Sequence, residues 1–319
     1  MFAFMRNRKR TCRRASDPCR AAVAGFTLIE MLVSLAVLSV IMGGVVTVIS
    51  TAEQTYARTG TKTDMYENVR GVAELMAQEI GQAGLVNLPA TTLNAATAVG
   101  ATTATLSSTT SLYVGERIQI DGGPEEETVV ISAITSPSIT FSPALAQIHS
   151  SGDSVTAIGS FINGIVPTTA TDPSSATTLN LFGDINGDGT LVYVRYVCTV
   201  GTTAAPGTLT RSVTTITPGV NTIAASQTLL NTVIGPAGGC FQYVQPTDNG
   251  TGTTYTFVTS VGFTVSVQAT VPDPQTGQYA TMTKSFLNLS PRNVAAGYEQ
   301  SVAKVATRLQ AAPPNVSLY

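Results

Sequence analysis

Glu30 is the only ionisable residue in a run of 25 residues from Phe26 to Ser50. At about 1.5 Å per residue, a helix over this run would span the hydrocarbon core of a bilayer. A carboxylate in such surroundings costs several kcal/mol unless it has a partner, so Glu30 is a candidate functional residue. Cleavage between Gly25 and Phe26 would create an amino group four residues away. We expect that group, on this subunit or a neighbour, to be the counter-charge of Glu30.

Three explanations compete for this apolar run: a secretory signal peptide, an ordinary membrane anchor and a processed membrane helix. A signal peptide has a shorter apolar core, and an ordinary anchor gives no account of Glu30. Residues 1–25 carry seven Lys or Arg and one Asp, a net charge of +6, and the rest of the chain has a net charge of −8. A basic arm directly before an apolar run favours a cytoplasmic N-terminus over direct nucleic-acid binding.

A second group of oxygen ligands lies in the sequence FGDINGDGTLVYVRY, where Asp184, Asn186 and Asp188 alternate before Gly189. This spacing is that of the start of a calcium loop. However, Arg195 stands where the closing carboxylate of such a loop should be. The alternative is a hairpin turn, because Asp, Asn and Gly tolerate positive φ. The turn is the favoured interpretation, with Ca²⁺ as the alternative.

The four cysteines divide into two pairs. Cys12 and Cys19 lie in the basic arm, and Cys198 and Cys240 lie far downstream. Only the downstream pair is expected in an oxidising compartment. A disulfide between Cys198 and Cys240 would contribute roughly 4 kcal/mol in the chain-entropy model, and two separate buried thiols are the alternative.

The sequence offers little for catalysis. His149 is its only histidine, and we expect it to be a structural turn residue. Glu125, Glu126 and Glu127 could attract a cation but are expected to form a solvated loop. No HExxH, G-x-S-x-G or Walker motif is present, so an enzyme is not expected, and no cofactor is certain.

Hydrophobic spacing predicts the elements that hold these residues. A helix is expected over 26–86, weakened near Gly60, with its membrane-spanning part at 26–50. Its second half has apolar residues at intervals of three or four, which predict a face packed on a sheet: Met65, Val69, Val72, Met76, Ile80 and Ala83. The opposite, solvated face is expected to carry Glu67, Arg70, Glu74 and Glu79.

The rest of the chain has short apolar or alternating runs between Gly, Pro, Asn and Ser clusters, which predict antiparallel strands. The expected fold class is α+β, a long N-terminal helix packed on an antiparallel sheet with an additional small β-rich insertion. The expected segments are a leader at 1–25, the helix at 26–86, the insertion at 87–160, a C-terminal sheet at 161–294 and a flexible tail at 295–319.

The sequence GFTLIEMLVSLAVLSVI resembles the class III signal of type IV pilins and pseudopilins. This family has a basic leader ending in Gly, then Phe, then Glu near the start of a long apolar helix, which Gly25, Phe26 and Glu30 match. The resemblance implies that a prepilin peptidase cleaves after Gly25 and methylates Phe26. It also implies that Glu30 pairs with a neighbouring subunit's terminus during assembly.

Weaker features resemble PilW-type minor pilins and the related J-type pseudopilins of type II secretion. They are an Arg-Tyr strand end at Arg195 and Tyr196, a Leu-x-Arg strand with Leu209 and Arg211, and an Arg-Asn pair at 292–293. The resemblance implies a minor pilin of the inner membrane, single-pass with a periplasmic C-terminal domain, that joins a pilus filament. Its implied partners are other pilin subunits and the prepilin peptidase. The alternatives are a secretion pseudopilin and a membrane-tethered adhesin or binding module.

Overall fold

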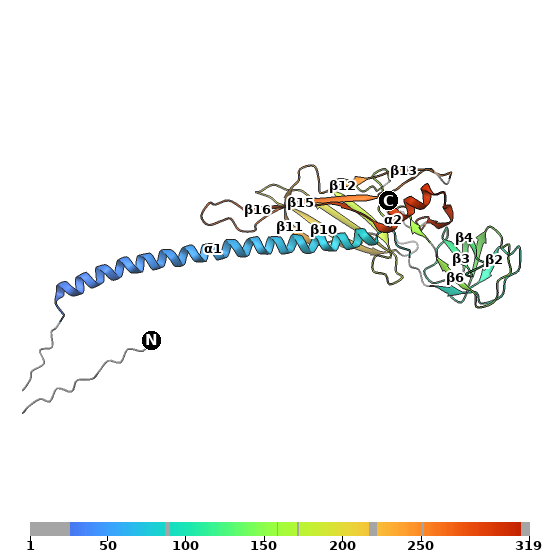
Figure 1. Cartoon of the computed structure of the whole chain (residues 1–319), viewed down its shortest axis with the longest axis horizontal. Coiled ribbons are helices and arrows are strands. Elements are labelled where there is room, and N and C mark those ends of the chain that lie inside the picture. Colours follow the sequence, from blue (N-terminus) through green and yellow to red (C-terminus); the bar gives the residue numbers. More distant parts are fainter. Residues whose placement is uncertain are drawn as a thin grey trace, which may run out of the picture. The chain divides into compact units, whose positions relative to one another are not determined.

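The computed structural model describes residues 26–86, 90–157, 159–170, 172–216, 222–249 and 252–313. The chain divides into two compact units, Met1–Thr55 and Tyr56–Tyr319. The architecture is α+β, as predicted (Figure 1). Its elements in chain order are α1 (Leu28–Gln82), β1 (Thr91–Thr92), β2 (Thr103–Thr105), β3 (Arg117–Ile120), β4 (Glu127–Thr135), β5 (Ser138–Ser142), β6 (Ser154–Ala157), β7 (Ser160–Phe161), β8 (Thr178–Gly183), β9 (Val192–Thr199), β10 (Gly207–Thr215), β11 (Gln227–Gly235), β12 (Phe241–Val244), β13 (Thr247–Asp248), β14 (Tyr255–Thr256), β15 (Ser260–Gln268), β16 (Thr281–Leu289), α2 (Arg292–Val302), η1 (Ala306–Arg308) and β17 (Leu309–Gln310).

Helix α1 is 55 residues long and passes through Gly60 without a break, so the weakening expected there does not interrupt it. The helix ends at Gln82, and Gly84 follows with φ +78°. A Cβ at Gly84 would lie 3.0 Å from Val294 Cγ2 and 3.1 Å from the carbonyl oxygen of Phe161. Glycine is therefore required here by both the left-handed conformation and the close approach of neighbouring segments.

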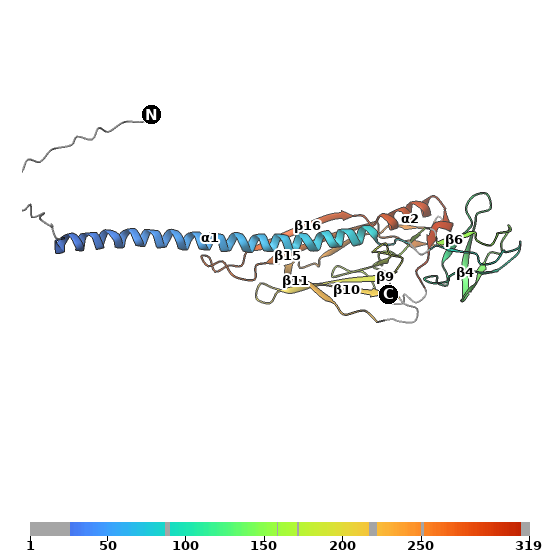
Figure 2. The same cartoon turned by 90° about the horizontal axis from the view of Figure 1, so that it is seen from below.

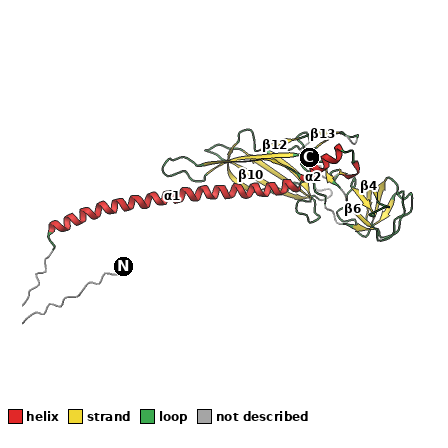
Figure 3. Ribbon diagram, viewed as in Figure 1, coloured by secondary structure: helices red, strands yellow, loops and turns green. Residues whose placement is uncertain are grey.

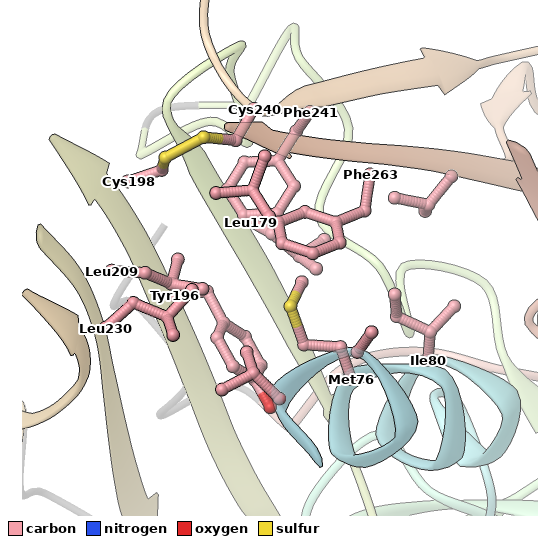
Figure 4. Close-up of a cluster of buried hydrophobic side chains, with 14 of the residues drawn as sticks. Met76, Ile80, Leu179, Tyr196, Cys198, Leu209, Leu230, Cys240, Phe241 and Phe263 are labelled. Atoms are coloured by element: carbon pink, nitrogen blue, oxygen red, sulfur yellow. A yellow bond between two sulfur atoms is a disulfide. The ribbon is translucent and has the colours of Figure 1, made fainter. Parts of the chain in front are cut away.

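The second half of α1 buries its apolar stripe, as the spacing predicts. All six stripe residues from Met65 to Ala83 are at most 9% exposed, and they share one core with side chains of the large sheet. Figure 4 shows Met76 and Ile80 directed toward the aromatic and aliphatic side chains of the strands. In Figures 1 and 2 this part of α1 runs along β10, β11 and β15. Burial of these side chains is the main driving force for attaching the helix to the sheet.

The sheet under the helix has seven strands, and every pairing in it is antiparallel. The order is β8, β9, β10, β11 and β15, and β12 and β16 also pair with β15. Strand β15 alternates between partly and fully buried positions along its length, which is typical of a strand with one face on the core.

Strands β1 to β6 form a separate six-stranded antiparallel sheet, which we call the β-module (Thr91–Ala157). Figure 3 shows it as strands and loops. It has its own hydrophobic core, with Ile118, Ile120 and Phe141 at its centre. Leu85 and Ser160 form an antiparallel bridge, so the chain leaves for the β-module and returns from it at neighbouring points. The β-module lies within the predicted insertion at 87–160.

The prediction of a loosely held tail from Ala295 is wrong for residues 295–313. Helix α2 covers Arg292–Val302 and buries Val294, Gly297 and Ser301. Strand β17 then pairs with β7 in parallel. Val294 shares a core with Phe257, and a Cβ at Gly297 would lie 2.9 Å from Ser160 Oγ on β7, so α2 is held against these segments.

Candidate processing and assembly site

The first turn of α1 is closed by Thr27 and Glu30. The backbone N–H of Thr27 and its hydroxyl donate to Glu30 Oε2 at 3.0 and 2.9 Å, and the backbone N–H of Glu30 donates to Thr27 Oγ1 at 3.3 Å. This reciprocal pair is a capping box, with Thr at the N-cap and Glu three residues later. Glu30 is thus a cap as well as a charge, which the T-x-x-E spacing of Thr27 and Glu30 also predicts. Gly25, on the other side of the proposed cleavage point, lies outside the described residues.

The apolar side chains that follow Glu30 are exposed throughout the first unit, from Leu32 at 56% to Ile49 at 51%. Among the helices described, α1 has the length and composition of a membrane span. Exposed apolar surface on this scale is stable only in a bilayer or against other apolar helices. The first unit therefore offers one apolar helical surface with a carboxylate at its start.

Glu79 is 5% exposed and lies between α1 and the sheet, so its predicted place on the solvated face of the helix is wrong. Arg211 Nε donates to Glu79 Oε2 at 3.2 Å, and a guanidinium NH2 group contacts Oε1. The hydroxyl of Tyr196 donates to the same carboxylate. Burial raises the pKa of Tyr196, and the neighbouring carboxylate of Glu79 raises it further. Burial by itself would lower the pKa of Arg211, but the bonds to Glu79 outweigh it, so this pKa is raised as well. We call these three residues the Glu79 cluster.

Asn293 binds the end of the same helix. Its side-chain amide donates to the carbonyl oxygens of Gln82 at 3.2 Å and Ala83 at 3.4 Å. Backbone carbonyls at a helix end lack partners within the helix, so this side chain supplies some of the missing donors. Tyr196, Arg211 and Asn293, which the sequence analysis noted only as weak family features, thus all bind the last turns of α1.

The loop between β8 and β9 holds the three residues considered as calcium ligands. Asp184 is fully buried, and its carboxylate accepts from the backbone N–H of Asp188 at 3.0 Å and of Gly189 at 2.9 Å. Asp188 Oδ1 accepts from the N–H of Thr190 at 2.8 Å. These bonds are those of a hairpin turn stabilised by its own side chains. Calcium binding by Asp184, Asn186 and Asp188 stays a prediction.

A disulfide joins Cys198 on β9 to Cys240 directly before β12, with a Cα–Cα distance of 6.2 Å (Figure 4). Both residues are 1% exposed and belong to the core that α1 covers. The bond connects strands at two places in the sheet that are 42 residues apart in sequence. It is therefore placed to hold the sheet together on the side that packs against the helix.

His149 is fully buried in the β-module and forms an isolated bridge with Thr97 rather than a turn. Its Nε2 lies 3.3 Å from Glu127 Oε1. Glu127 is itself partly buried, whereas Glu125 and Glu126 are exposed, as expected for a solvated loop. The three glutamates that the sequence groups together therefore lie in different environments.

Glu116 is a buried acid that should make stability depend on pH. Burial raises its pKa to about 8 from an ordinary value of 4.5, against a weaker opposite effect of the Tyr113 N–H at 3.1 Å. The folded chain then binds this proton more tightly than the unfolded chain, so its contribution is full below about pH 4.5 and is lost as pH rises to about 8. The slope is at most ~1.4 kcal/mol per pH unit.

We therefore expect Glu116→Gln, which mimics the protonated acid, to gain stability relative to the wild type as pH rises from 5 to 8. The measurement is the thermal unfolding midpoint of the full chain in detergent micelles at both pH values. Glu126→Gln removes a charge from an exposed position and serves as the control. If the two variants keep the same difference from the wild type at both pH values, Glu116 is not the group that titrates.

Comparison with protein families gives one match. Residues 20–46 match the prokaryotic N-terminal methylation motif. The comparisons with curated proteins and with solved structures found no significant match. The matched segment contains Gly25, Phe26, the capping box of Thr27 and Glu30, and most of the apolar run. The chain thus carries a prepilin-type N-terminal methylation motif at the start of a pilin-like helix of 55 residues that packs on an antiparallel sheet.

Proposed function

We propose that the chain is a structural minor pilin of a type IV pilus, which is processed in the inner membrane and then enters the filament or its tip. A prepilin peptidase cleaves between Gly25 and Phe26 and methylates the new amino group. Glu30 then neutralises the terminus of a neighbouring subunit as the apolar helices pack together. The C-terminal domain lies in the periplasm before assembly. No catalytic role is proposed.

The methylation motif at residues 20–46 is the observation that carries this proposal. The exposed apolar surface that follows it supports helix packing as the driving force for assembly, because that surface is unfavourable in water and has to be covered by lipid or by other helices. Glu30 fits the pairing role in one further respect. The capping box uses Oε2, and Oε1 has no partner among the residues that the structure describes. One oxygen of Glu30 is therefore available to a second subunit.

The assignment to a PilW-type minor pilin has narrower support. Three residues that belong to that resemblance, Tyr196, Arg211 and Asn293, each bind the last turns of α1. A secretion pseudopilin would need the same helix chemistry and is the closest alternative.

Mass spectrometry of the N-terminal peptide tests the processing step. The chain is isolated from membranes and from sheared filaments, with and without the prepilin peptidase. We expect a mature chain that begins at methylated Phe26 and that is lost without the peptidase. A chain that retains residues 1–25 in the presence of the peptidase would contradict the proposal.

Two variants separate the charge of Glu30 from its capping role. Glu30→Gln keeps an acceptor for the capping box but removes the charge, and we expect it to remain in the membrane and to be lost from filaments by roughly tenfold or more, since a buried terminus without its counter-charge costs about 3–5 kcal/mol. Thr27→Ala removes the cap, which is worth about 1 kcal/mol, but keeps the charge. This variant should still assemble.

The readout for both variants is the ratio of subunit in sheared filaments to subunit in membranes, measured by immunoblot. Cleavage at Gly25 is checked in each, because a processing defect would also reduce assembly. Equal assembly by Glu30→Gln and wild type would show that the carboxylate acts only as a cap.

The β-module gives a specific reason to keep a second candidate, a membrane-tethered binding module. It has its own sheet and core, and the Leu85–Ser160 bridge brings its two ends together. A short Gly-Ser linker can therefore replace residues 90–157. If the chain is primarily an assembly subunit, the shortened chain should still enter filaments. If recognition is its main role, filament entry should be unaffected while adhesion or substrate capture is lost.

A further inference from the structure

Three potential metal ligands converge at one end of the β-module. One ring nitrogen of His149 and one carboxylate oxygen from each of Asp121 and Asp153 lie within 4.8 Å of one another. Asp121 directly follows β3, and Asp153 directly precedes β6. These strands are paired, and the backbone N–H of Asp121 donates to the carbonyl oxygen of Ser154 at 2.8 Å. The sheet itself therefore holds the two carboxylates next to each other.

Glu127 contacts the ring of His149. Its Oε1 lies 3.3 Å from His149 Nε2, and its two oxygens accept from the backbone N–H groups of Ala146 at 2.8 Å and Gln147 at 2.6 Å. An ionised carboxylate only accepts hydrogen bonds, so this contact selects the tautomer with the proton on Nε2. The other ring nitrogen, Nδ1, then carries a lone pair.

Nδ1 of His149 is buried and has no hydrogen-bond partner in the part of the chain that the structure describes. A buried acceptor without a donor costs about 1–3 kcal/mol, so it calls for an explanation. A carboxylate that holds the far nitrogen of a histidine is the arrangement by which proteins orient imidazole toward a metal ion. Glu127 thus occupies the supporting position, and Nδ1 is the free ligand atom.

The two aspartates keep one oxygen each for a ligand. Asp121 Oδ1 accepts from the N–H of Gly122 and Asp153 Oδ2 from the N–H of Ser150, both at 2.6 Å. These bonds fix the carboxylates and leave Asp121 Oδ2 and Asp153 Oδ1. Both side chains are partly buried, so the group remains open to solvent on one side.

We propose that Asp121, His149 and Asp153 bind a divalent transition-metal ion such as Zn²⁺. The free atoms of all three are acceptors, and a cation satisfies them together where a water molecule could donate to only two. One imidazole nitrogen with two carboxylate oxygens suits Zn²⁺ or Mn²⁺, whereas Ca²⁺ prefers an all-oxygen set. The ion would join the loop after β3 to the segment before β6.

Zinc binding to the full chain in detergent micelles tests this site. The chain is purified through a tag without histidine, and Cys12→Ser and Cys19→Ser are present in every sample so that these thiols cannot bind the metal. We expect one Zn²⁺ per chain by calorimetry and by metal analysis after dialysis. Asp121→Asn/Asp153→Asn should weaken binding by about 100-fold or more.

Glu125→Gln/Glu126→Gln is the matched control, because it removes the same number of charges at exposed positions of the loop that holds Asp121. It should bind zinc as the wild type does. The proposal would be overturned if the wild type bound no zinc. It would also be overturned if the aspartate variant and the glutamate variant bound zinc with the same affinity.

A second readout covers the case in which the aspartate variant unfolds. His149 is the only histidine, so ¹⁵N-labelled histidine gives a single imidazole in the spectrum of the chain. Zinc should move the Nδ1 resonance of the wild-type chain while Nε2 stays protonated. A spectrum that zinc leaves unchanged, or one in which Nε2 loses its proton, would also overturn the site.

Discussion

Glu79→Leu is expected to lower the free energy of unfolding by about 3–5 kcal/mol, because it leaves a partly buried guanidinium without its carboxylate. Arg211 makes two contacts to Glu79, and the Tyr196 hydroxyl makes a third. The change also removes the polar contacts of Glu79 between α1 and strands β9 and β10. The measurement is urea unfolding of the full chain in detergent micelles, followed by tyrosine fluorescence, since the chain has ten Tyr and no Trp.

Glu74→Leu is the matched control. Glu74 lies on the same helix and also pairs with an arginine, Arg70, at 2.7 Å, but this pair is exposed to solvent, which screens it. A second variant, Glu79→Leu/Arg211→Met, removes both charges and should recover most of the loss. A cost for Glu79→Leu no larger than for Glu74→Leu would mean that the cluster does not hold the helix.

Removing the disulfide is expected to cost roughly 4 kcal/mol, because the loop that it closes, between cysteines separated by 42 positions, regains freedom in the unfolded chain. For a domain of this size the loss corresponds to roughly 8–16 °C in the thermal midpoint. Cys198→Ala/Cys240→Ala is the suitable variant, since serine hydroxyls would be buried at both positions. The midpoint is measured by circular dichroism.

Cys12→Ser/Cys19→Ser controls for general effects of losing thiols and should leave the midpoint unchanged. Treatment of the wild type with dithiothreitol should reproduce the loss. An unchanged midpoint after mass spectrometry has shown full reduction would contradict the expected contribution of the bond.

The sequence alone predicts the elements well where periodicity is strong. The stripe from Met65 to Ala83 identifies the buried face of α1, and short runs between turn residues, such as ETVVISAIT and SITFS, form strands β4 and β5. Such patterns suffice because burial of one face imposes a regular spacing. Helix α2 was missed because its buried positions include Gly297 and Ser301, which carry no hydrophobic signal.

The functional residues also divide into those that a local motif predicts and those that only the fold brings together. Gly25, Phe26 and Glu30 form a local motif, so their spacing can be read directly. The burial of Glu79 could not be predicted from the sequence, because it depends on a contact with Arg211. That arginine is 132 residues away, and nothing in the sequence marks it as the partner. The group around His149 was also missed, since Asp121 lies in the connection from β3 to β4 and the other two members lie in the connection from β5 to β6, which only the sheet of the β-module brings together.

The bond from Asn293 to the end of α1 has a consequence for synthesis. Gln82 is made 211 residues before the side chain that binds its carbonyl oxygen. The β-module lies entirely between them in the sequence and closes on contacts within itself, so a growing chain can complete it first. The end of α1 stays open until residue 293 emerges. A chain cut short before that point would leave the carbonyl oxygens of Gln82 and Ala83 without this donor, so incomplete and complete subunits differ at the end of α1.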